Sequence, residues 1–314
     1  AMPMTWPALP LDSWRDTRDT LQMWTQIAGK ICLALAPPVN HFWNIAFRVT
    51  PRGLLTPTLP YRDRTFSMTF DFVSHEFIID VSDGTREALP LRARSVSEFY
   101  AETMAALKRL GIEVHIWTMP VEVANPIRFE TDHTHRSYDA EAVSRFHDVL
   151  LAITPELELF RCDFVGKCSP VHFFWGSFDL AVTRFSGKPA PMRPDADVIT
   201  REAYSHAVIS HGWWPGGGLG PTPFNDAAFY AYAVPEPAGL KTAPVQPAAA
   251  FYSHDLGEFI LPYEAVRSAP APESALQSFL WTTYDAAAQL AGWDRVSLER
   301  HAAPAGGAHG KDSR

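Results

Sequence analysis

The stretch GKCSPVHFFWGSFDLAVTRFSG, residues 166–187, predicts a buried strand that carries polar side chains. From Val171 to Phe185 nearly every residue is aromatic, aliphatic or β-branched, and a bend at Ser169–Pro170 leads into the strand. An unpaired polar group inside a protein costs on the order of 1–3 kcal/mol. The polar members must therefore find partners in the core or line a site; they are Lys167, Ser169, His172, Asp179 and Arg184.

The order of features around this stretch repeats an earlier one. Residues 26–53 and 163–187 each contain Gly-Lys, a proline bend, His-Phe and Trp, and Val-Thr before a basic turn that ends in Gly. Residues 89–111 and 261–292 each begin with Leu-Pro and lead through Arg-Ser into an Ala-rich amphipathic pattern. We therefore expect an α+β fold made by tandem duplication of an antiparallel sheet with helices on one face, the two similar halves packing about a pseudo-twofold axis. Chance similarity of two strand–helix patterns is the alternative.

The length of 314 residues favours two linked halves, because it exceeds the size at which a single core stops growing. We expect the first repeat in residues 1–125 and the second in residues 126–300. The small, polar and Gly-rich residues 301–314 are expected to be a disordered tail.

The spacing of apolar residues and the positions of glycine, proline and capping residues predict the individual helices and strands. A helix should span Trp14–Ala28 and end at Gly29, with an apolar strand after it and a second strand over His41–Thr50. Ser95 or Ser97 should cap one later helix, and Asp139 another. Residues 66–72 and 77–81 alternate as half-buried strands do, and Asp83–Gly84 should form the turn that follows them. Gly111 should end a helix, with a strand at residues 112–117 after it and a connection over residues 119–139. Residues 204–232 are expected to be a functional loop rich in aromatic residues and glycine.

The charge balance bears on partners and location. The formal net charge is −8 and no run is rich in Lys or Arg, which argues against nucleic acid or an anionic membrane as the main partner. No window of about 18 apolar residues indicates a membrane-spanning helix, and the amino terminus does not resemble a secretory signal. Cys32, Cys162 and Cys168 form no even framework, so we expect reduced thiols in a cytoplasmic protein. The oligomeric state is left open.

Five residues are the candidates for catalysis: His172, His206, Glu258, Asp179 and Tyr204. Histidine can act as acid or base near neutral pH, and Trp213 and Trp214 could form an apolar wall beside His206. In one straight strand, His172 and Asp179 would face opposite sides. The alternative for both histidines is a structural role in the core.

Glu258 is expected in a strand whose two faces are both largely apolar. A buried carboxylate must be protonated, paired with a cation or bound to a metal, because desolvation of the free charge is costly. One interpretation is a salt bridge to Arg184 or Arg267. The other is that Glu258 shares a pocket with His172 or His206, as general base, partner or metal ligand.

Substrate-binding candidates surround these groups. Arg184 or Lys167 would hold an anionic group of the substrate, and Ser169 is a further polar candidate. The apolar walls are expected from Trp175, Trp214, Phe229 and Tyr230.

Asp132, His133 and His135 form the one local cluster with metal-like spacing. In an extended segment the two histidines would share a face and could bind a divalent metal, and a solvated loop is the alternative. No nucleotide cofactor is expected, because GGGLG at residues 216–220 lacks the spacing and the helix that phosphate binding requires.

The strings GKCSPVHFFWGSFDLAVTRFSG, EAYSH followed by GWWPGG, AFYAYAVPEP and LGEFILPYEAVR resemble a bacterial family classed as a domain of unknown function. The resemblance runs from about residue 14 to residue 295 and implies no reaction. The residues themselves lead to three hypotheses. The first is a small-molecule enzyme of hydrolase or lyase type in an aromatic-lined pocket of the second half; the alternative is a non-catalytic ligand-binding protein or sensor, and the third is a His/carboxylate metalloenzyme.

Overall fold

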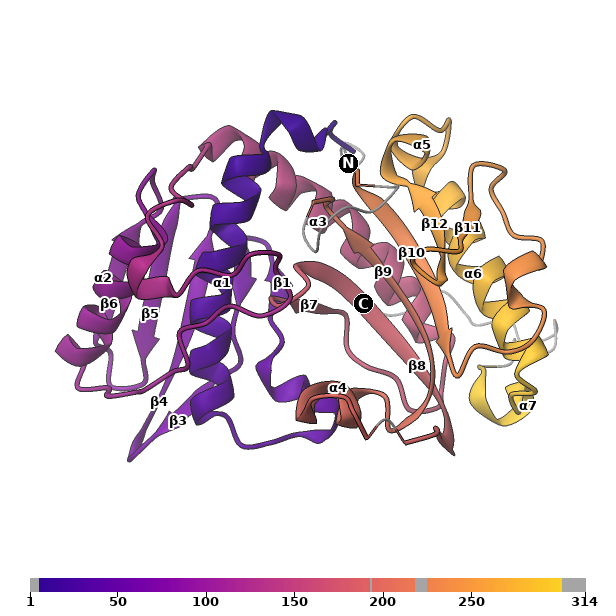
Figure 1. Cartoon of the computed structure of the whole chain (residues 1–314), viewed down its shortest axis with the longest axis horizontal. Coiled ribbons are helices and arrows are strands. Elements are labelled where there is room, and N and C mark those ends of the chain that lie inside the picture. The colour runs from indigo at the N-terminus through magenta and orange to yellow at the C-terminus, as the bar shows by residue number, and fades with distance from the viewer. Residues whose placement is uncertain (1–5, 193, 218–224, 301–314) are drawn as a thin grey trace, which may run out of the picture.

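The computed structural model describes residues 6–192, 194–217 and 225–300, and these form an α+β fold with two antiparallel sheets (Figure 1). The expected fold class is confirmed at this level. The tail predicted at residues 301–314 lies outside the described residues. None of the helices in the described ranges has the length and apolar character needed to cross a bilayer.

The first sheet follows a long helix and is formed by six short strands. Its order is β1-β2-β4-β5-β6, and β3 pairs with β4 beside β2. Apolar side chains of β4 and β5 pack under the helices: Phe70 and Phe77 contact Phe99 of α2, and Phe99 stacks on Trp24 of α1. The elements are η1 (Leu11–Ser13), α1 (Arg15–Leu35), η2 (Asn40–Ile45), β1 (Arg48–Thr50), β2 (Gly53–Leu55), β3 (Leu59–Tyr61), β4 (Arg64–Asp71), β5 (Glu76–Val81), β6 (Arg86–Pro90) and α2 (Val96–Arg109).

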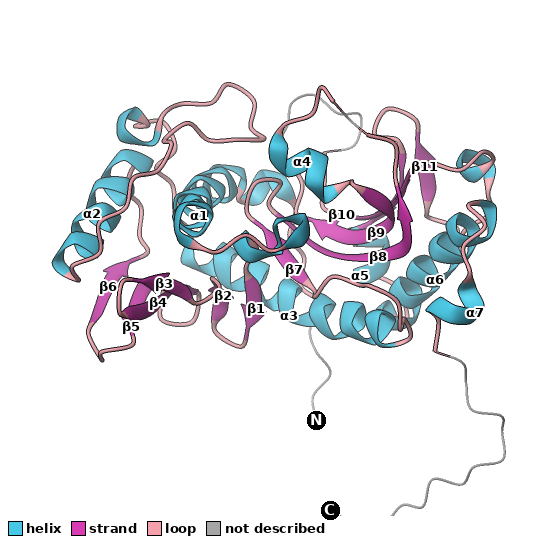
Figure 2. Ribbon diagram, turned by 90° about the horizontal axis from the view of Figure 1, so that it is seen from below, coloured by secondary structure: helices cyan, strands magenta, loops and turns pink. Residues whose placement is uncertain are grey.

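The second sheet also follows a long helix, and its order is β11-β12-β10-β9-β8-β7. Figure 2 shows α3 beneath this sheet and α4 above it, whereas α1 and α2 lie above the first sheet. The elements are η3 (Phe129–Thr131), α3 (Ala140–Cys162), β7 (His172–Phe174), β8 (Asp179–Pro189), α4 (Val198–Ala203), β9 (His206–Trp214), β10 (Ala228–Val234), η4 (Leu240–Thr242), β11 (Phe251–Ser253), β12 (Glu258–Pro262), α5 (Tyr263–Arg267), α6 (Pro272–Leu290) and α7 (Arg295–Leu298).

The two sheets meet at Phe47 and Phe173. These residues form an isolated antiparallel bridge in which each backbone N–H donates to the other carbonyl, at 2.9 and 2.8 Å. Phe47 lies next to β1, the first strand of the first sheet, and Phe173 lies within β7, the first strand of the second sheet. The two sheets therefore meet at their first strands. One hydrophobic cluster runs through both halves and includes both phenylalanines.

Gly29 does not end the first helix, because α1 continues to Leu35. The apolar strand predicted directly after it is therefore wrong. Glycine at this position allows α1 to lie close to Trp175, because a Cβ here would be 2.1 Å from Cε2 of that residue. Of the predicted strand His41–Thr50 only β1 exists, since residues 40–45 form the 3₁₀ segment η2.

The stretch 171–185 is two strands and not one. Trp175–Phe178 form a tight turn, and Phe178 adopts a φ of +60°. In the resulting hairpin, His172 pairs with Ala181 and Phe174 with Asp179. Paired residues of antiparallel strands point to the same face, so the turn brings His172 and Asp179 to one side of the sheet, contrary to expectation.

Other local expectations had mixed outcomes. Ser95 caps α2 in a capping box with Glu98, and Asp139 caps α3 through the N–H groups of Glu141 and Ala142, as predicted. Gly84 and Gly111 adopt the positive φ that their turn and helix-end positions require. Residues 112–117 lie outside both sheets, so the strand predicted there is wrong. Residues 206–214 and 228–234 are strands and not a loop.

Candidate functional site

The second sheet has one core face and one open face. Leu180, Val182 and Arg184 of β8 are buried on the core side, as are Trp213 of β9 and Phe229 of β10. Alternate residues point the other way because side chains in a strand change face at every step. The open face is bounded by α4, by η2 and by the connection near residue 122, and a cleft lies between them.

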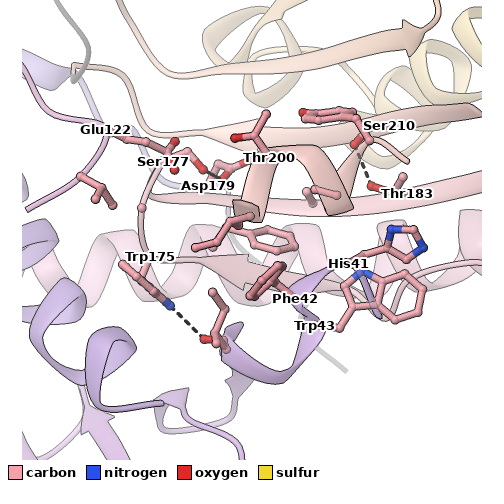
Figure 3. Close-up of a pocket in the computed structure, with 18 of the residues that line it drawn as sticks. His41, Phe42, Trp43, Glu122, Trp175, Ser177, Asp179, Thr183, Thr200 and Ser210 are labelled. Carbon is pink, nitrogen blue, oxygen red and sulfur yellow. Dashed lines mark hydrogen bonds between the residues drawn. The ribbon is translucent and has the colours of Figure 1, made fainter. Parts of the chain in front are cut away.

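The cleft has two lobes that share Glu122, Ser177, Asp179, Tyr204, Tyr230 and Tyr232. The aromatic lobe, of about 280 Å³, extends from these residues toward η2 and Phe185. The acidic lobe, of about 330 Å³, extends toward β12. Figure 3 shows Glu122, Ser177 and Asp179 grouped together and His41 and Trp43 at a distance from them. The aromatic lobe is further lined by His41, Phe42, Trp43, Phe174, Trp175 and Phe185, and the acidic lobe by Gln22, Trp214, Leu256, Glu258 and Ile260.

Asp179 lies where the two lobes join. It is 8% exposed, and its carboxylate accepts hydrogen bonds from the hydroxyls of Ser177 and Tyr230. Burial raises the pKa of Asp179 above its usual value, and the two hydroxyl donors act in the opposite direction. A buried carboxylate that is oriented by two donors and exposed to a cavity can accept a proton from a bound molecule.

Glu258 and Glu122 are the two other carboxyl groups of the cleft. Burial and the nearby charge of Asp179 raise the pKa of Glu258 to about 8. The same two causes, followed by the charge of Asp197, raise the pKa of Glu122 to about 7. Glu122 is exposed at the rim of the cleft, so solvent weakens the rise of its pKa. The raised pKa of Glu258 is therefore the better supported of the two.

Three tyrosines connect the lobes. The rings of Tyr230 and Tyr232 stack with centroids 6.0 Å apart, and the hydroxyls of Tyr232 and Tyr204 are hydrogen-bonded at 2.8 Å. Burial raises the pKa of Tyr230 and Tyr232 well above 10, so both hydroxyls stay protonated and can donate. Gly212 leaves room for this arrangement, because a Cβ there would lie 2.3 Å from the hydroxyl of Tyr230.

The far end of the aromatic lobe is closed by η2 and α4. Nδ1 of the His41 ring donates to the backbone carbonyl of Glu202 at 3.0 Å, and the backbone N–H of His41 donates to Oε1 of the Glu202 side chain. Lys167 Nζ donates to Nε2 of His41 at 2.6 Å and lies over the rings of Trp43 and Phe185. Burial lowers the pKa of His41, so this ring is neutral near pH 7.

Neither predicted histidine lines the cleft. His172 lies on the same face of the sheet as Asp179, and its ring contacts that of Trp43 with centroids 6.5 Å apart. Burial lowers the pKa of His172 to about 4. The ring of His206 is 5.9 Å from that of His41 and accepts or donates one hydrogen bond with Ser205.

Of the other candidates, Tyr204, Trp175, Trp214 and Tyr230 line the cleft together with Asp179 and Glu258. Among the described residues no salt bridge joins Glu258 to Arg184 or Arg267.

Three further candidates do not face the cavity. Arg184 is fully buried on the core face, where it donates to the carbonyl of Phe160 and lies 3.5 Å from the ring centroid of that residue. Phe229 packs on the same face near Tyr263. Ser169 is buried, and its hydroxyl accepts from the Thr183 N–H.

The cluster of Asp132, His133 and His135 forms a local turn. Oδ1 of Asp132 accepts from the N–H groups of Thr134 and His135, and Oδ2 accepts from Nδ1 of His135 at 2.7 Å. His133 is exposed. Within the described ranges, no group of three or more His, Cys, Asp or Glu side chains is arranged to hold a metal ion.

Glu122, Ser177, Tyr232 and His41 were not among the candidates, although all four line the cleft. Tyr232 carried a usable signal, since it lies two positions after Tyr230 in a strand and must share its face. Glu122 comes from a connection without regular structure, where no periodic pattern could indicate its direction.

No curated protein and no solved structure matches the chain. A family model described as a family of unknown function, DUF5996, matches residues 6–300. The match includes both sheets and every residue of the two lobes. The chain therefore belongs to DUF5996, a family of unknown function.

Proposed function

We propose that the protein is a small-molecule enzyme that performs acid–base chemistry of hydrolase or lyase type in the cleft. Asp179 would be the base and Glu258 the acid. The observation that carries this proposal is the presence of three carboxyl groups in one cleft, of which Asp179 is oriented by Ser177 and Tyr230. Two carboxyls held in different environments at one cavity can serve as acid and base together.

In a hydrolysis, the Asp179 carboxylate takes a proton from water as the water oxygen attacks the substrate. Glu258 gives its proton to the leaving group, so one bond forms and one breaks. The carboxyls end with exchanged protonation states and return by exchange with solvent. In an elimination, the same base removes a proton from carbon and the same acid protonates the leaving group. Both reactions need Glu258 protonated, which its raised pKa of about 8 provides at neutral pH.

Backbone strain at the wall of the cleft supports a functional role. His41, Phe42 and Glu122 adopt φ values of +59°, +56° and +55°. Non-glycine residues in this region cost about 1–3 kcal/mol each, and such costs gather at functional sites. All three residues line the aromatic lobe.

The test is substrate depletion in a small-molecule extract, followed by mass spectrometry. Asp179→Asn keeps the shape of the side chain and removes its charge, so we expect a turnover loss of about 100-fold or more. The matched control is Asp80→Asn, because Asp80 is an exposed residue of β5 in the other sheet. Equal turnover by Asp179→Asn and wild type would remove Asp179 from the mechanism.

The second candidate is a non-catalytic ligand-binding protein on the same fold. It is favoured by the absence of His172 and His206 from the lining of both lobes as described. Aromatic walls serve binding as readily as catalysis. A small molecule that is retained by the wild type unchanged, and lost from Asp179→Asn, would support this candidate.

The cytoplasm is the proposed location, and the free thiols of Cys32, Cys162 and Cys168 support it.

We also propose that the two sheets arose by duplication, with the halves divided near residue 125. The order of a long helix, antiparallel strands and a helix occurs twice, and Leu-Pro ends both β6 and β12. The bridge between Phe47 and Phe173 pairs the first strand regions of the two sheets. The Gly-Lys pairs are not equivalent in structure, since Gly29 lies in a helix and Gly166 in a loop.

A further inference from the structure

We infer that the ligand of this cleft is an organic cation with an apolar body: an ammonium or related group bound in the acidic lobe, and an apolar part held in the aromatic lobe. The inference rests on the proposed function, because it names the class of molecule on which that cleft would act. It extends the proposal by stating the charge and the orientation of the ligand.

The charges that face the cleft are all of one kind. Glu122, Asp179 and Glu258 line the acidic lobe, and no Lys, Arg or His does so among the described residues. The aromatic lobe adds only His41, whose Nε2 already accepts from Lys167. Three carboxyl groups around one partly enclosed space repel one another when ionised, and a bound cation removes that repulsion.

Aromatic faces complete the acidic lobe. Tyr230 and Tyr232 form a stacked pair, and Tyr204 and Trp214 line the same space. Rings of tyrosine and tryptophan attract cations through the negative potential of their faces, most strongly where water is excluded. Carboxylates and ring faces together are the surroundings that select an ammonium group over a neutral hydroxyl.

The cations near the cleft lie outside the described lining of the acidic lobe. Lys167 lies at the edge, with Nζ on His41 and over two rings. Arg18 is 1% exposed and donates through Nη1 to Asp19 and Gln22, and its Nε and Nη2 have no hydrogen-bond partner among the described residues. Its guanidinium lies next to Gly217, which lines the acidic lobe, but Arg18 itself does not line the lobe. Arg184 lies on the opposite face of the sheet. A ligand carboxylate in the acidic lobe would therefore meet three carboxyl groups and no cation in the described lining.

Binding of a cation should release protons. The groups that surround Glu258 are Asp179 from β8, Tyr230 from β10, Tyr252 from β11 and Glu122 from the connection, and none of them is cationic. An ammonium group beside Glu258 lowers the pKa of that carboxyl from about 8, so a fraction of Glu258 releases its proton at neutral pH, and the fraction that keeps the proton can still act as the acid. Affinity should rise with pH up to about 8 and then level off, because aliphatic amines stay charged to about pH 10.

The experiment uses three probes of the same shape and different charge: phenethylamine, phenethyl alcohol and phenylacetate. Isothermal titration calorimetry of the full chain at pH 7, in phosphate and in Tris, gives affinity and the number of protons released. We expect the amine to bind at least ~10-fold tighter than the alcohol, with proton release, and phenylacetate to bind weakest. In Glu258→Gln, amine binding should weaken ~10-fold and release fewer protons. Glu264→Gln is the control, because Glu264 is exposed and paired with Arg267.

The inference is overturned if the alcohol or phenylacetate binds as tightly as the amine, or if none of the three binds at millimolar concentration. It is also overturned if the amine binds equally to Glu258→Gln and to wild type. None of these outcomes depends on turnover. Asp179→Asn can lose activity even if the cleft does not prefer the amine, and the cleft can prefer the amine even if Asp179→Asn keeps its activity. The proposed function and the proposed ligand class can therefore fail separately.

Discussion

Gly29, in the middle of α1, lies directly against the indole of Trp175, which forms part of the wall of the aromatic lobe. Nε1 of Trp175 donates to the carbonyl of Ile45 at 2.9 Å. One tryptophan therefore joins the first helix, the strained η2 segment and the turn before Asp179. The position of the cleft depends on the absence of a side chain at residue 29.

Gly29→Ala should destabilise the protein by about 1–3 kcal/mol, although alanine is the better helix former by about 1 kcal/mol. A Cβ would lie 2.1 Å from the Trp175 ring, so the ring or the helix must move. Urea denaturation measures the loss. The double variant Gly29→Ala/Trp175→Phe should regain part of it, because the smaller ring leaves space. A more stable Gly29→Ala protein would show that the contact is looser than described.

The stability of the protein should fall as the pH rises from about 4.5 to about 8. The pKa of Glu258 is about 8 in the folded protein and 4.5 ordinarily, so between these values the unfolded chain has lost a proton that the folded protein keeps. The free energy of unfolding then decreases with pH. Glu258→Gln should remove on the order of 1–3 kcal/mol of this decrease, as measured by denaturation at pH 5 and pH 8.

Glu264→Gln is the control for this measurement, because Glu264 is exposed and paired with Arg267. It should keep the pH dependence of the wild type. If Glu258→Gln and wild type show parallel curves between pH 5 and pH 8, Glu258 is not desolvated as described.

His135→Ala should lower stability by about 1–2 kcal/mol at pH 6, because buried Asp132 then loses one of its donors. Asp132 raises the pKa of His135, so the charged form contributes fully below the ordinary pKa and is lost as the pH rises through the raised value. The difference should therefore be smaller at pH 9.

His133→Ala is the matched control for this turn, since the side chain is exposed and should change stability by less than about 0.5 kcal/mol. Thermal melts with and without zinc complete the test. An increase in Tm with zinc that depends on both histidines would contradict the local turn and favour a metal site.

Limited trypsin digestion should cleave after Arg128, an exposed residue of the connection between the halves. The two fragments should stay associated on size exclusion, because one hydrophobic cluster spans both and the backbone groups of Phe47 and Phe173 are hydrogen-bonded across the cut. Separation of the fragments, or earlier cleavage inside either sheet, would argue against a division near residue 125.

Local signals in the sequence predicted the elements whose cause is local. Ser95 and Asp139 cap helices through their own neighbours, and the alternating residues of β4 and β5 bury one face. Glycine signals were ambiguous, because Gly29 fits either a helix end or a close contact. Only the distant Trp175 decides between them.

The candidate site was predicted in part. Asp179, Glu258, Tyr204 and Tyr230 meet in one cleft, yet the sequence placed histidines at its centre. The error has a physical origin in the stretch 171–185. An uninterrupted apolar run cannot reveal the turn at residues 175–178, and that turn decides which face Asp179 occupies.

Because residues from both halves of the chain line the cleft, the order of synthesis decides when its lining is complete. Gln22 and His41 are made first, Asp179 follows more than a hundred residues later, and Glu258 and Ile260 of β12 are the last lining residues of the acidic lobe to be made. Domains fold largely as they leave the ribosome, from the amino terminus onward. A nascent chain that stops before β12 would have the residues that line the aromatic lobe and would lack Glu258 and Ile260, so the acidic lobe can be complete only after β12 has emerged.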